Sequence, residues 1–275
     1  MAWSAVVSED LLPKVEQLKK IGYDGIEIFL GEGDEDLYKR FGKQVKDLGL
    51  EMTSVMVLGP DENPISPDAE IRAKGLDKIK WTIDRAHDMN IKLIGGPFHS
   101  AFATFYDKAP DEEEYARSAE ILSEAGDYAA EAGILLTPEA INRFECYLCN
   151  TMDQIVGLIE KVDHPNVKVH YDTHHANIEE KSIADSLRKV APVLGHVHIS
   201  ENDRGTPGKG HIRWNETFET LAEIEYDGWL TIEAFTRNDP DFANSINVWR
   251  EYDTPWEVAE EGYSFIQNMC EKYGL

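Results

Sequence analysis

Short apolar segments alternate with longer segments of mixed polarity along most of the chain. The short segments are rich in Ile, Val and Leu, which is typical of parallel strands that helices cover from outside. They predict seven strands, at residues 25–29, 51–57, 91–96, 134–139, 167–172, 195–200 and 229–234. The longer segments have helical spacing of apolar residues, and several end before a glycine. They predict helices at residues 9–21, 36–48, 68–89, 111–132, 151–162, 182–190, 215–224 and 255–272.

This repeated alternation of strand and helix predicts an α/β protein with a parallel sheet and right-handed crossovers. The 275 residues are close to the roughly 250 of one (β/α)8 TIM barrel. Since no linker-like tract divides the chain, we expect residues 1–275 to form a single TIM-barrel domain. An eighth strand has only residues 1–7 available, so the first strand is expected to be short or truncated. A doubly wound open sheet is the alternative fold, but it requires a glycine-rich phosphate loop that the chain does not supply.

Four consecutive predicted strands end in side chains that bind metals in other proteins, and the carboxyl ends of barrel strands form the active site. These side chains are Glu139, Asp172, His198 and Glu233, which lie 33, 26 and 35 residues apart, about one strand–helix unit each. One such residue alone is more often solvated or a helix cap. Four in register converge on one point, and burying three carboxylates together without a cation is costly.

We therefore predict that Glu139, Asp172, His198 and Glu233 hold one divalent metal ion. Three carboxylates and one imidazole favour Mn²⁺, with Co²⁺ or Mg²⁺ as alternatives, over a cation that prefers thiolates. His196 shares its side of the strand with His198, and we expect it to pack one layer deeper without binding the metal.

The net charge of −25 argues against nucleic acids and anionic membrane surfaces as partners, because binding phosphates requires a basic patch. No apolar run reaches the roughly 18 residues of a membrane span, and the first residues lack the pattern of a signal peptide. Three cysteines suit a reducing cytoplasm, which is the expected location. Cys146 and Cys149 form a CxxC motif, but a structural zinc site needs a second ligand pair.

Four segments carry a more specific signal: NRFECYLCN, YDTHHANIEE, HVHISENDRGTPG and DGWLTIEAF. They resemble the D-tagatose/D-psicose (allulose) 3-epimerase family of the xylose-isomerase-like barrels. The resemblance implies a metal-dependent isomerase that interconverts C3 epimers of free ketoses. By position it implies Glu139, Asp172, His198 and Glu233 as metal ligands, and Glu139 and Glu233 as the paired acid and base. It also implies a homodimer or homotetramer.

The same resemblance implies that Glu145, His175 and Arg204 contact the sugar. Proton removal next to the C2 carbonyl suits this chemistry, because a cation stabilises the enediolate and two carboxylates serve the two faces of C3. A related sugar isomerase or an inosose-type dehydratase on the same barrel is the first alternative. A DNA-repair endonuclease conflicts with the negative charge. A noncatalytic sugar-binding protein is the alternative from a different functional class.

Overall fold

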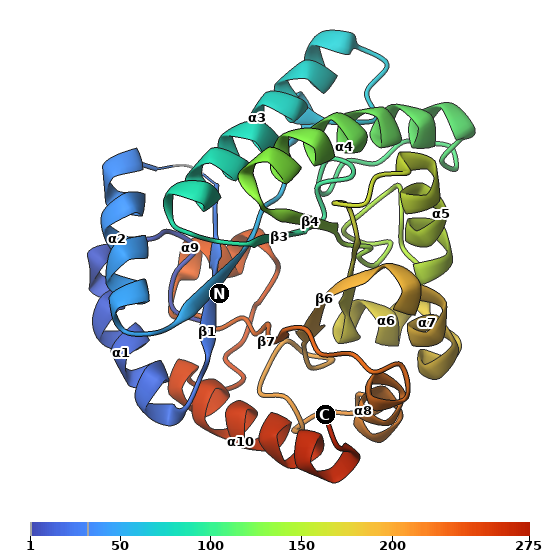
Figure 1. Ribbon diagram of the computed structural model, residues 1–275. Helices are drawn as coiled ribbons and strands as arrows, with labels where there is room; N and C mark the ends of the chain where they lie inside the picture. The colour runs from blue at the N-terminus through green and yellow to red at the C-terminus, as the bar shows by residue number, and fades with distance from the viewer. Residues whose placement is uncertain (1, 32) are drawn as a thin grey trace.

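The computed structural model describes residues 2–31 and 33–275. Its parallel strands form a curved wall with the helices on the outside (Figure 1), as the sequence predicted. The strands are β1 (Gly25–Phe29), β2 (Glu51–Val55), β3 (Leu93–Gly96), β4 (Leu135–Pro138), β5 (Val169–Asp172), β6 (Leu194–Ile199) and β7 (Leu230–Ile232). Each overlaps one of the seven predicted strands, so the predicted α/β TIM barrel is confirmed.

The strands pair in chain order, β1 to β4 in one sheet and β5 to β7 in a second sheet. Isolated parallel bridges, Leu136 to Val167 and Glu139 to His170, join β4 to β5. Asp172 stands opposite His198 in the register of β5 and β6. Neighbouring strands therefore bring their carboxyl ends to the same level.

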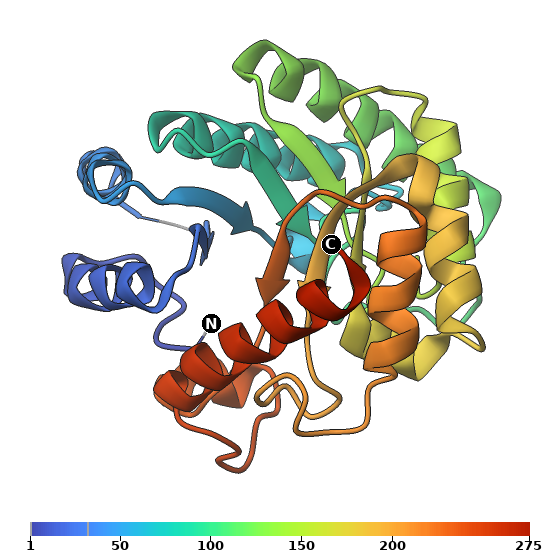
Figure 2. The same cartoon turned by 60° about the horizontal axis from the view of Figure 1, so that its bottom comes forward.

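The longer α-helices lie outside this wall (Figures 1 and 2). The α-helices of the described residues are α1 (Leu12–Ile21), α2 (Glu35–Asp47), α3 (Ala69–Asp88), α4 (Glu112–Ala132), α5 (Met152–Val162), α6 (Thr173–Glu179), α7 (Ile183–Val190), α8 (Trp214–Glu223), α9 (Pro240–Ser245) and α10 (Pro255–Tyr273). The eight predicted helices are confirmed to within a few residues. Side-chain caps begin several of them; Asp111, for example, accepts a hydrogen bond from the Glu114 amide at the start of α4.

The sequence did not predict α6 and α9, which are short and lack an apolar stripe. Helix α6 starts at Asp172, whose side chain accepts a hydrogen bond from the His175 amide over 2.9 Å. Helix α9 starts at Asp239 in the same way, with Pro240 at its first position. Both helices begin at a capping side chain. Such a cap is a weaker signal in the sequence than a periodic pattern of apolar residues.

The wall has an opening between β1 and β7, which are not paired with each other among the described residues. The sequence predicted a first strand that is either short or truncated. Residues 2–7 form no strand there, so the prediction of a short strand is wrong. A cavity of about 590 Å³ lies in its place, lined by residues 2–7, β1, β7 and α10. Tyr23 on the β1 side donates a hydrogen bond to the Ala259 carbonyl of α10 over 2.9 Å. This contact ties the two sides of the opening together.

Candidate metal centre

Three of the four predicted metal ligands form a buried cluster at the carboxyl ends of adjacent strands. Glu139 follows β4, Asp172 ends β5, and His198 is the penultimate residue of β6. One ligand atom from each lies within 4.8 Å of the others. The exposed fraction is 3% for Glu139 and zero for Asp172 and His198. Residues about one strand–helix unit apart in the sequence are thus close in space, because neighbouring strands of the barrel end at the same level.

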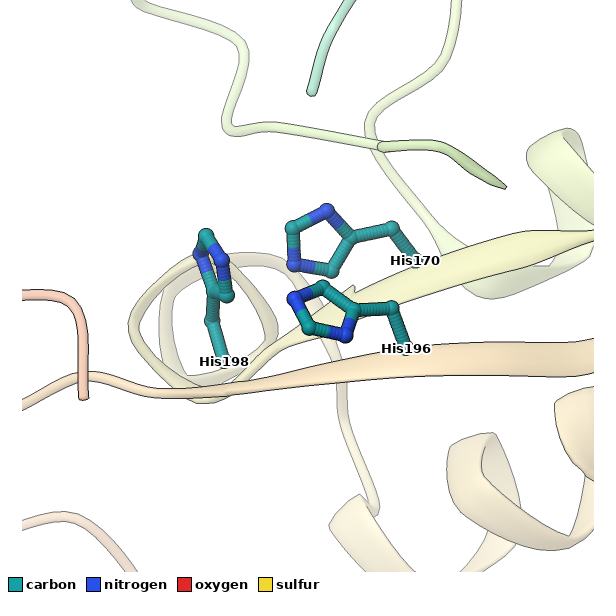
Figure 3. Close-up of side chains that lie close together, drawn as sticks. All are labelled: His170, His196 and His198. Carbon is teal, nitrogen blue, oxygen red and sulfur yellow. The ribbon is translucent and has the colours of Figure 1, made fainter. Parts of the chain in front are cut away.

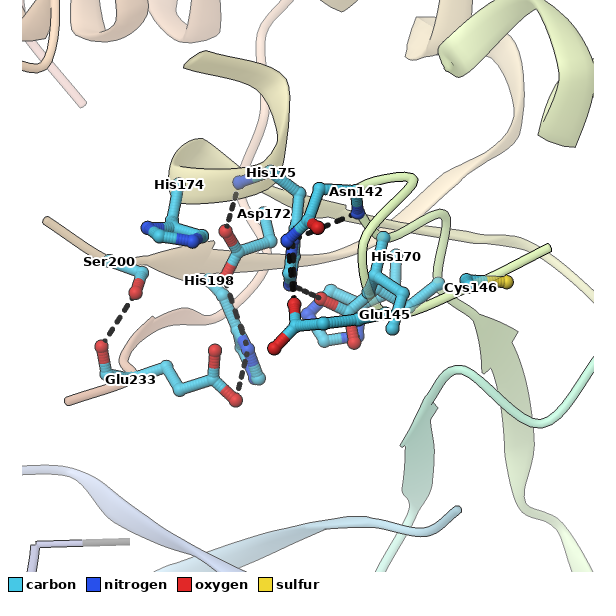
Figure 4. A network of polar contacts seen from close by, with 12 residues as sticks. Asn142, Glu145, Cys146, His170, Asp172, His174, His175, His198, Ser200 and Glu233 are labelled. Atoms are coloured by element: carbon cyan, nitrogen blue, oxygen red, sulfur yellow. Dashed lines mark hydrogen bonds and ion pairs between the residues drawn. The ribbon is translucent and has the colours of Figure 1, made fainter. Parts of the chain in front are cut away.

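Glu233, the fourth predicted ligand, directly follows β7 and completes the cluster from the side. Its Oε1 lies 3.5 Å from Nδ1 of His198, and Figure 4 shows the two side chains facing each other. The Glu233 amide donates to the Ile199 carbonyl over 3.2 Å, and Ser200 Oγ donates to the Glu233 carbonyl over 2.8 Å. These bonds hold the segment after β7 against the end of β6.

The polar atoms of this cluster fit a divalent cation. Oε1 of Glu139 and Nδ1 of His198 are buried and have no hydrogen-bond partner among the described residues. A buried polar atom without a partner is costly. Carboxylate oxygens and one imidazole nitrogen are donors that a divalent cation of intermediate hardness accepts. A cation among these atoms would satisfy both orphaned groups at once.

Burial and neighbouring charges move the two glutamate pKa values in opposite directions. Burial, helped by the negative charge of Glu233, raises the pKa of Glu139 well above its usual range. Burial also acts to raise the pKa of Glu233, but the positive charges of Arg204 and His198 outweigh it and lower that pKa well below its usual range. Burial raises the pKa of Asp172 to about 6. The electrostatic surroundings of the two glutamates are therefore different, although both face the same cluster.

Arg204 lies directly against two of the predicted ligands. Its Nη1 donates to Glu233 Oε2 over 2.6 Å, to Ser200 Oγ over 2.8 Å and to Asp172 Oδ2 over 3.3 Å. Its backbone has a left-handed φ of 65°, which is unusual for a side chain of this size. The guanidinium also stacks 4.9 Å from the ring centre of Phe235. Arg204 thus places a fixed positive charge at the edge of the carboxylate cluster.

His175 and Glu145, the other predicted sugar contacts, belong to one polar network (Figure 4), and His175 lies beside Arg204. Nε2 of His175 is 2.8 Å from Nη2 of Arg204. Because Arg can only donate, this nitrogen accepts, and Nδ1 of His175 is 3.8 Å from Glu145 Oε2. Asn142 links the pair by donating to Glu145 over 2.6 Å. Burial, followed by the charge of Arg204, lowers the pKa of His175 well below its usual range, so its imidazole is neutral.

A layer of polar side chains below the cluster was only partly predicted. Figure 3 shows His170, His196 and His198 grouped inside the barrel, with ring centres 3.9 to 5.1 Å apart. His196 lies one layer deeper, as expected, whereas His170 and Glu27 were missed. His170 precedes Asp172 by two residues, so strand alternation could have found it. Glu27 stands alone among apolar residues in the middle of β1, which is a signal of the same kind.

The two cysteines of the CxxC motif are free thiols. Cys146 and Cys149 are both buried. Neither belongs to a group of side chains that could hold a metal ion among the described residues. No helix in the described parts of the chain is long and apolar enough to cross a membrane.

Comparison with known proteins gives consistent matches over most of the chain. Residues 15–267 match the protein family described as a xylose isomerase-like TIM barrel. The D-psicose 3-epimerase of Agrobacterium fabrum is 33% identical over 262 residues, which are 94% of this chain and 91% of that protein. The D-psicose 3-epimerase of Ruminiclostridium cellulolyticum is 34% identical over 257 residues, which are 90% of this chain and 86% of that protein.

Solved structures agree with these matches. The structure of an L-ribulose 3-epimerase has a TM-score of 0.92 and 29% identity, with 99% of this chain and 93% of that chain covered. The crystal structure of a D-psicose 3-epimerase in the presence of D-fructose has a TM-score of 0.88 and 33% identity, with 95% of this chain and 94% of that chain covered.

Proposed function

Because this chain belongs to the ketose 3-epimerases of the xylose isomerase-like TIM barrels, we propose that it interconverts C3 epimers of a small free ketose with the aid of one divalent cation. Its relatives are sugar epimerases, and the chain is an isomerase of that kind. We propose, in addition, which kind of ketose and which cation it uses, and which residues take part.

One observation carries this proposal: two glutamates, the buried Glu139 and the partly buried Glu233, face the same cluster. Glu139 follows β4 and Glu233 follows β7, so they reach the cluster from different parts of the barrel wall. Epimerisation at C3 removes a proton on one face and returns a proton on the other. Glu233 is proposed to take the C3 proton and Glu139 to return one, because their carboxyl groups reach the cluster from the ends of β7 and β4. When the epimerisation runs in the opposite direction, the two glutamates exchange these roles.

Glu139, Asp172, His198 and Glu233 are proposed to hold the cation, with Mn²⁺ as the resident ion and Co²⁺ or Mg²⁺ as alternatives. When bound, the cation supplies positive charge that stabilises an enediolate. Two orphaned ligand atoms, Oε1 of Glu139 and Nδ1 of His198, support this assignment.

Arg204, His175 and Glu145 are proposed to bind and orient the sugar beside the acid and base. Arg204 has N–H groups suited to sugar oxygens, and the carboxylate of Glu145 accepts hydrogen bonds from hydroxyls, while Nε2 of His175 holds the guanidinium of Arg204. From the family resemblance we infer a homodimer or homotetramer, and from the three cysteines a cytoplasmic location.

A screen of free ketoses and ketose phosphates with the metal-loaded protein tests the proposed function. Chromatography should show C3 epimers of at least one free ketose, and little turnover of the phosphorylated sugars. Aldoses as the main products would instead favour a sugar isomerase. Sugar binding by calorimetry without any turnover would favour a noncatalytic binding protein.

A further inference from the structure

Glu27 stands in the middle of β1, on the barrel wall that faces β6, and its carboxylate accepts three hydrogen bonds. Thr53 Oγ1 donates to its Oε2 over 2.7 Å, and His196 Nε2 donates to the same oxygen over 2.9 Å. The other oxygen, Oε1, lies 2.6 Å from Nε2 of His198. Only 11% of the Glu27 side chain is exposed. Its position and orientation are therefore fixed by the protein.

The two ring nitrogens of His198 face different groups. Nε2 faces Glu27, whereas Nδ1 faces the predicted ligands, 3.5 Å from Glu233 Oε1 and 3.7 Å from Asp172 Oδ2. An ionised carboxylate only accepts hydrogen bonds, so the proton of a neutral imidazole stays on Nε2. The lone pair is then on Nδ1, which is the atom that has no hydrogen-bond partner. The contact with Glu27 selects the tautomer that a metal ligand needs.

We propose that Glu27 is a positioning residue of the metal centre, which fixes the ring and the tautomer of His198 so that Nδ1 binds the cation. The inference rests on the proposed function, because it takes Glu139, Asp172, His198 and Glu233 as the ligand set. A carboxylate behind a metal-binding histidine also makes the imidazole a stronger donor. Thr53 on β2 and His196 on β6 hold Glu27 in place by donating hydrogen bonds to it. Residues on both sides of the barrel therefore help to position the metal centre.

A second cation among the three histidines is the competing explanation of this layer. His170, His196 and His198 can bring one nitrogen each within 4.8 Å of the others, and both nitrogens of His170 are buried without a partner. However, Nε2 of both His196 and His198 already donates to Glu27. A nitrogen that donates a proton has no lone pair for a cation, so His196 and His198 can each offer only Nδ1. The Nδ1 of His198 already lies beside Asp172 and Glu233, which leaves only His170 and Nδ1 of His196 for a second ion in this cluster. The geometry therefore favours one cation per chain, with Glu27 behind it.

Metal titration of Glu27→Gln tests the proposal without substrate. The amide keeps the size of Glu27 but loses its charge and presents N–H groups to the ring. We expect Mn²⁺ or Co²⁺ to bind on the order of 10- to 100-fold more weakly by calorimetry, the loss typical of such supporting groups. The absorption bands of the bound Co²⁺ should also shift. Glu114→Gln is the matched control, since Glu114 is a buried glutamate on α4 whose carboxylate also accepts hydrogen bonds, from the Asp111 amide and the Tyr147 hydroxyl.

The control should lose thermal stability at most and keep the metal affinity of the wild type. Equal affinities of wild type and Glu27→Gln would overturn the inference even if the wild type epimerises ketoses. Two cations per wild-type chain would overturn it as well. If Glu27→Gln does not fold, ¹⁵N-histidine NMR of the Mg²⁺-loaded wild type decides: the proposal requires His198 to carry its proton on Nε2, and a proton on Nδ1 would refute it. Ketose turnover tests the proposed function separately.

Discussion

Nη1 of Arg204 donates to Oε2 of Glu233 over 2.6 Å, so the guanidinium neutralises part of the ligand cluster. The same nitrogen reaches Asp172 over 3.3 Å. Two residues that the sequence assigned to different tasks, sugar binding and metal binding, are therefore in direct contact. The contact links the charge of the cluster to Arg204.

Arg204→Met should weaken sugar binding and leave the cation bound. Without the guanidinium, the carboxylates of the metal-free protein lose a compensating charge, so that form should melt at a lower temperature. The rise in melting temperature on adding Mn²⁺ should consequently be larger than in the wild type. The KM for the ketose should rise by at least tenfold. Loss of metal affinity in this variant would show that Arg204 supports the ligands themselves.

Removal of the cation should abolish activity and lower stability. The carboxyl groups of Glu139, Asp172 and Glu233 face one another in this cluster. Arg204 offsets part of their repulsion, and a cation that binds the folded state relieves the rest. After treatment with a chelator, turnover should disappear and the melting temperature should fall. Mn²⁺ or Co²⁺ should restore both, in proportion to occupancy measured by elemental analysis. Full turnover by a preparation shown to lack metal would contradict this prediction.

Metal affinity should decrease as the pH falls through about 6. Burial raises the pKa of Asp172 to about 6, and a cation binds only its ionised form. Above pH 6 the carboxylate is free for the cation, whereas below it a proton must leave first. That competition costs roughly tenfold in affinity per pH unit for one proton. Calorimetry at pH 5 and pH 7.5 measures the difference, and equal affinities would show that Asp172 is not a ligand.

Glu201 should stabilise the glycine-rich loop after β6. Its buried carboxylate accepts hydrogen bonds from the amides of Asn202, Gly208 and Ile212 and from the Trp214 indole, over 2.9 to 3.2 Å. Glu201→Ala leaves the buried Ile212 amide and Trp214 indole unpaired, at about 1–3 kcal/mol each before relaxation. Thermal unfolding should show a clear loss of stability, and proteolysis should cleave this loop first. The exposed Glu219→Ala on α8 is the control and should change neither.

The strand ends were predictable because a parallel barrel repeats one unit. Glu139, Asp172, His198 and Glu233 follow that unit, so their spacing alone placed them at one end of the wall. Glu27 was not predictable in the same way, since it acts from the middle of β1 and lies 171 residues from His198 in the chain. Such contacts depend on which strands face each other across the barrel, and no local pattern encodes that.

Short capped helices and the opening in the wall were also beyond the sequence. Helix α6 is set by one hydrogen bond between Asp172 and the His175 amide, and its polar sequence has no periodicity. The expectation of a short first strand failed because residues 2–7 pair with neither β1 nor β7. An edge strand needs a partner with free hydrogen-bonding groups in the right direction. The apolar residues of 2–7 line the cavity between β1 and β7 instead.

Solvent labelling at C3 tests the central claim most directly. If Glu139 and Glu233 remove and return the C3 proton, the proton is lost to a carboxyl group that exchanges with water. Turnover of the accepted ketose in D₂O by the metal-loaded protein should therefore give an epimer with deuterium at C3 and none at C1, read by NMR of the isolated product. Product labelled at C1, or an epimer without deuterium, would contradict the account.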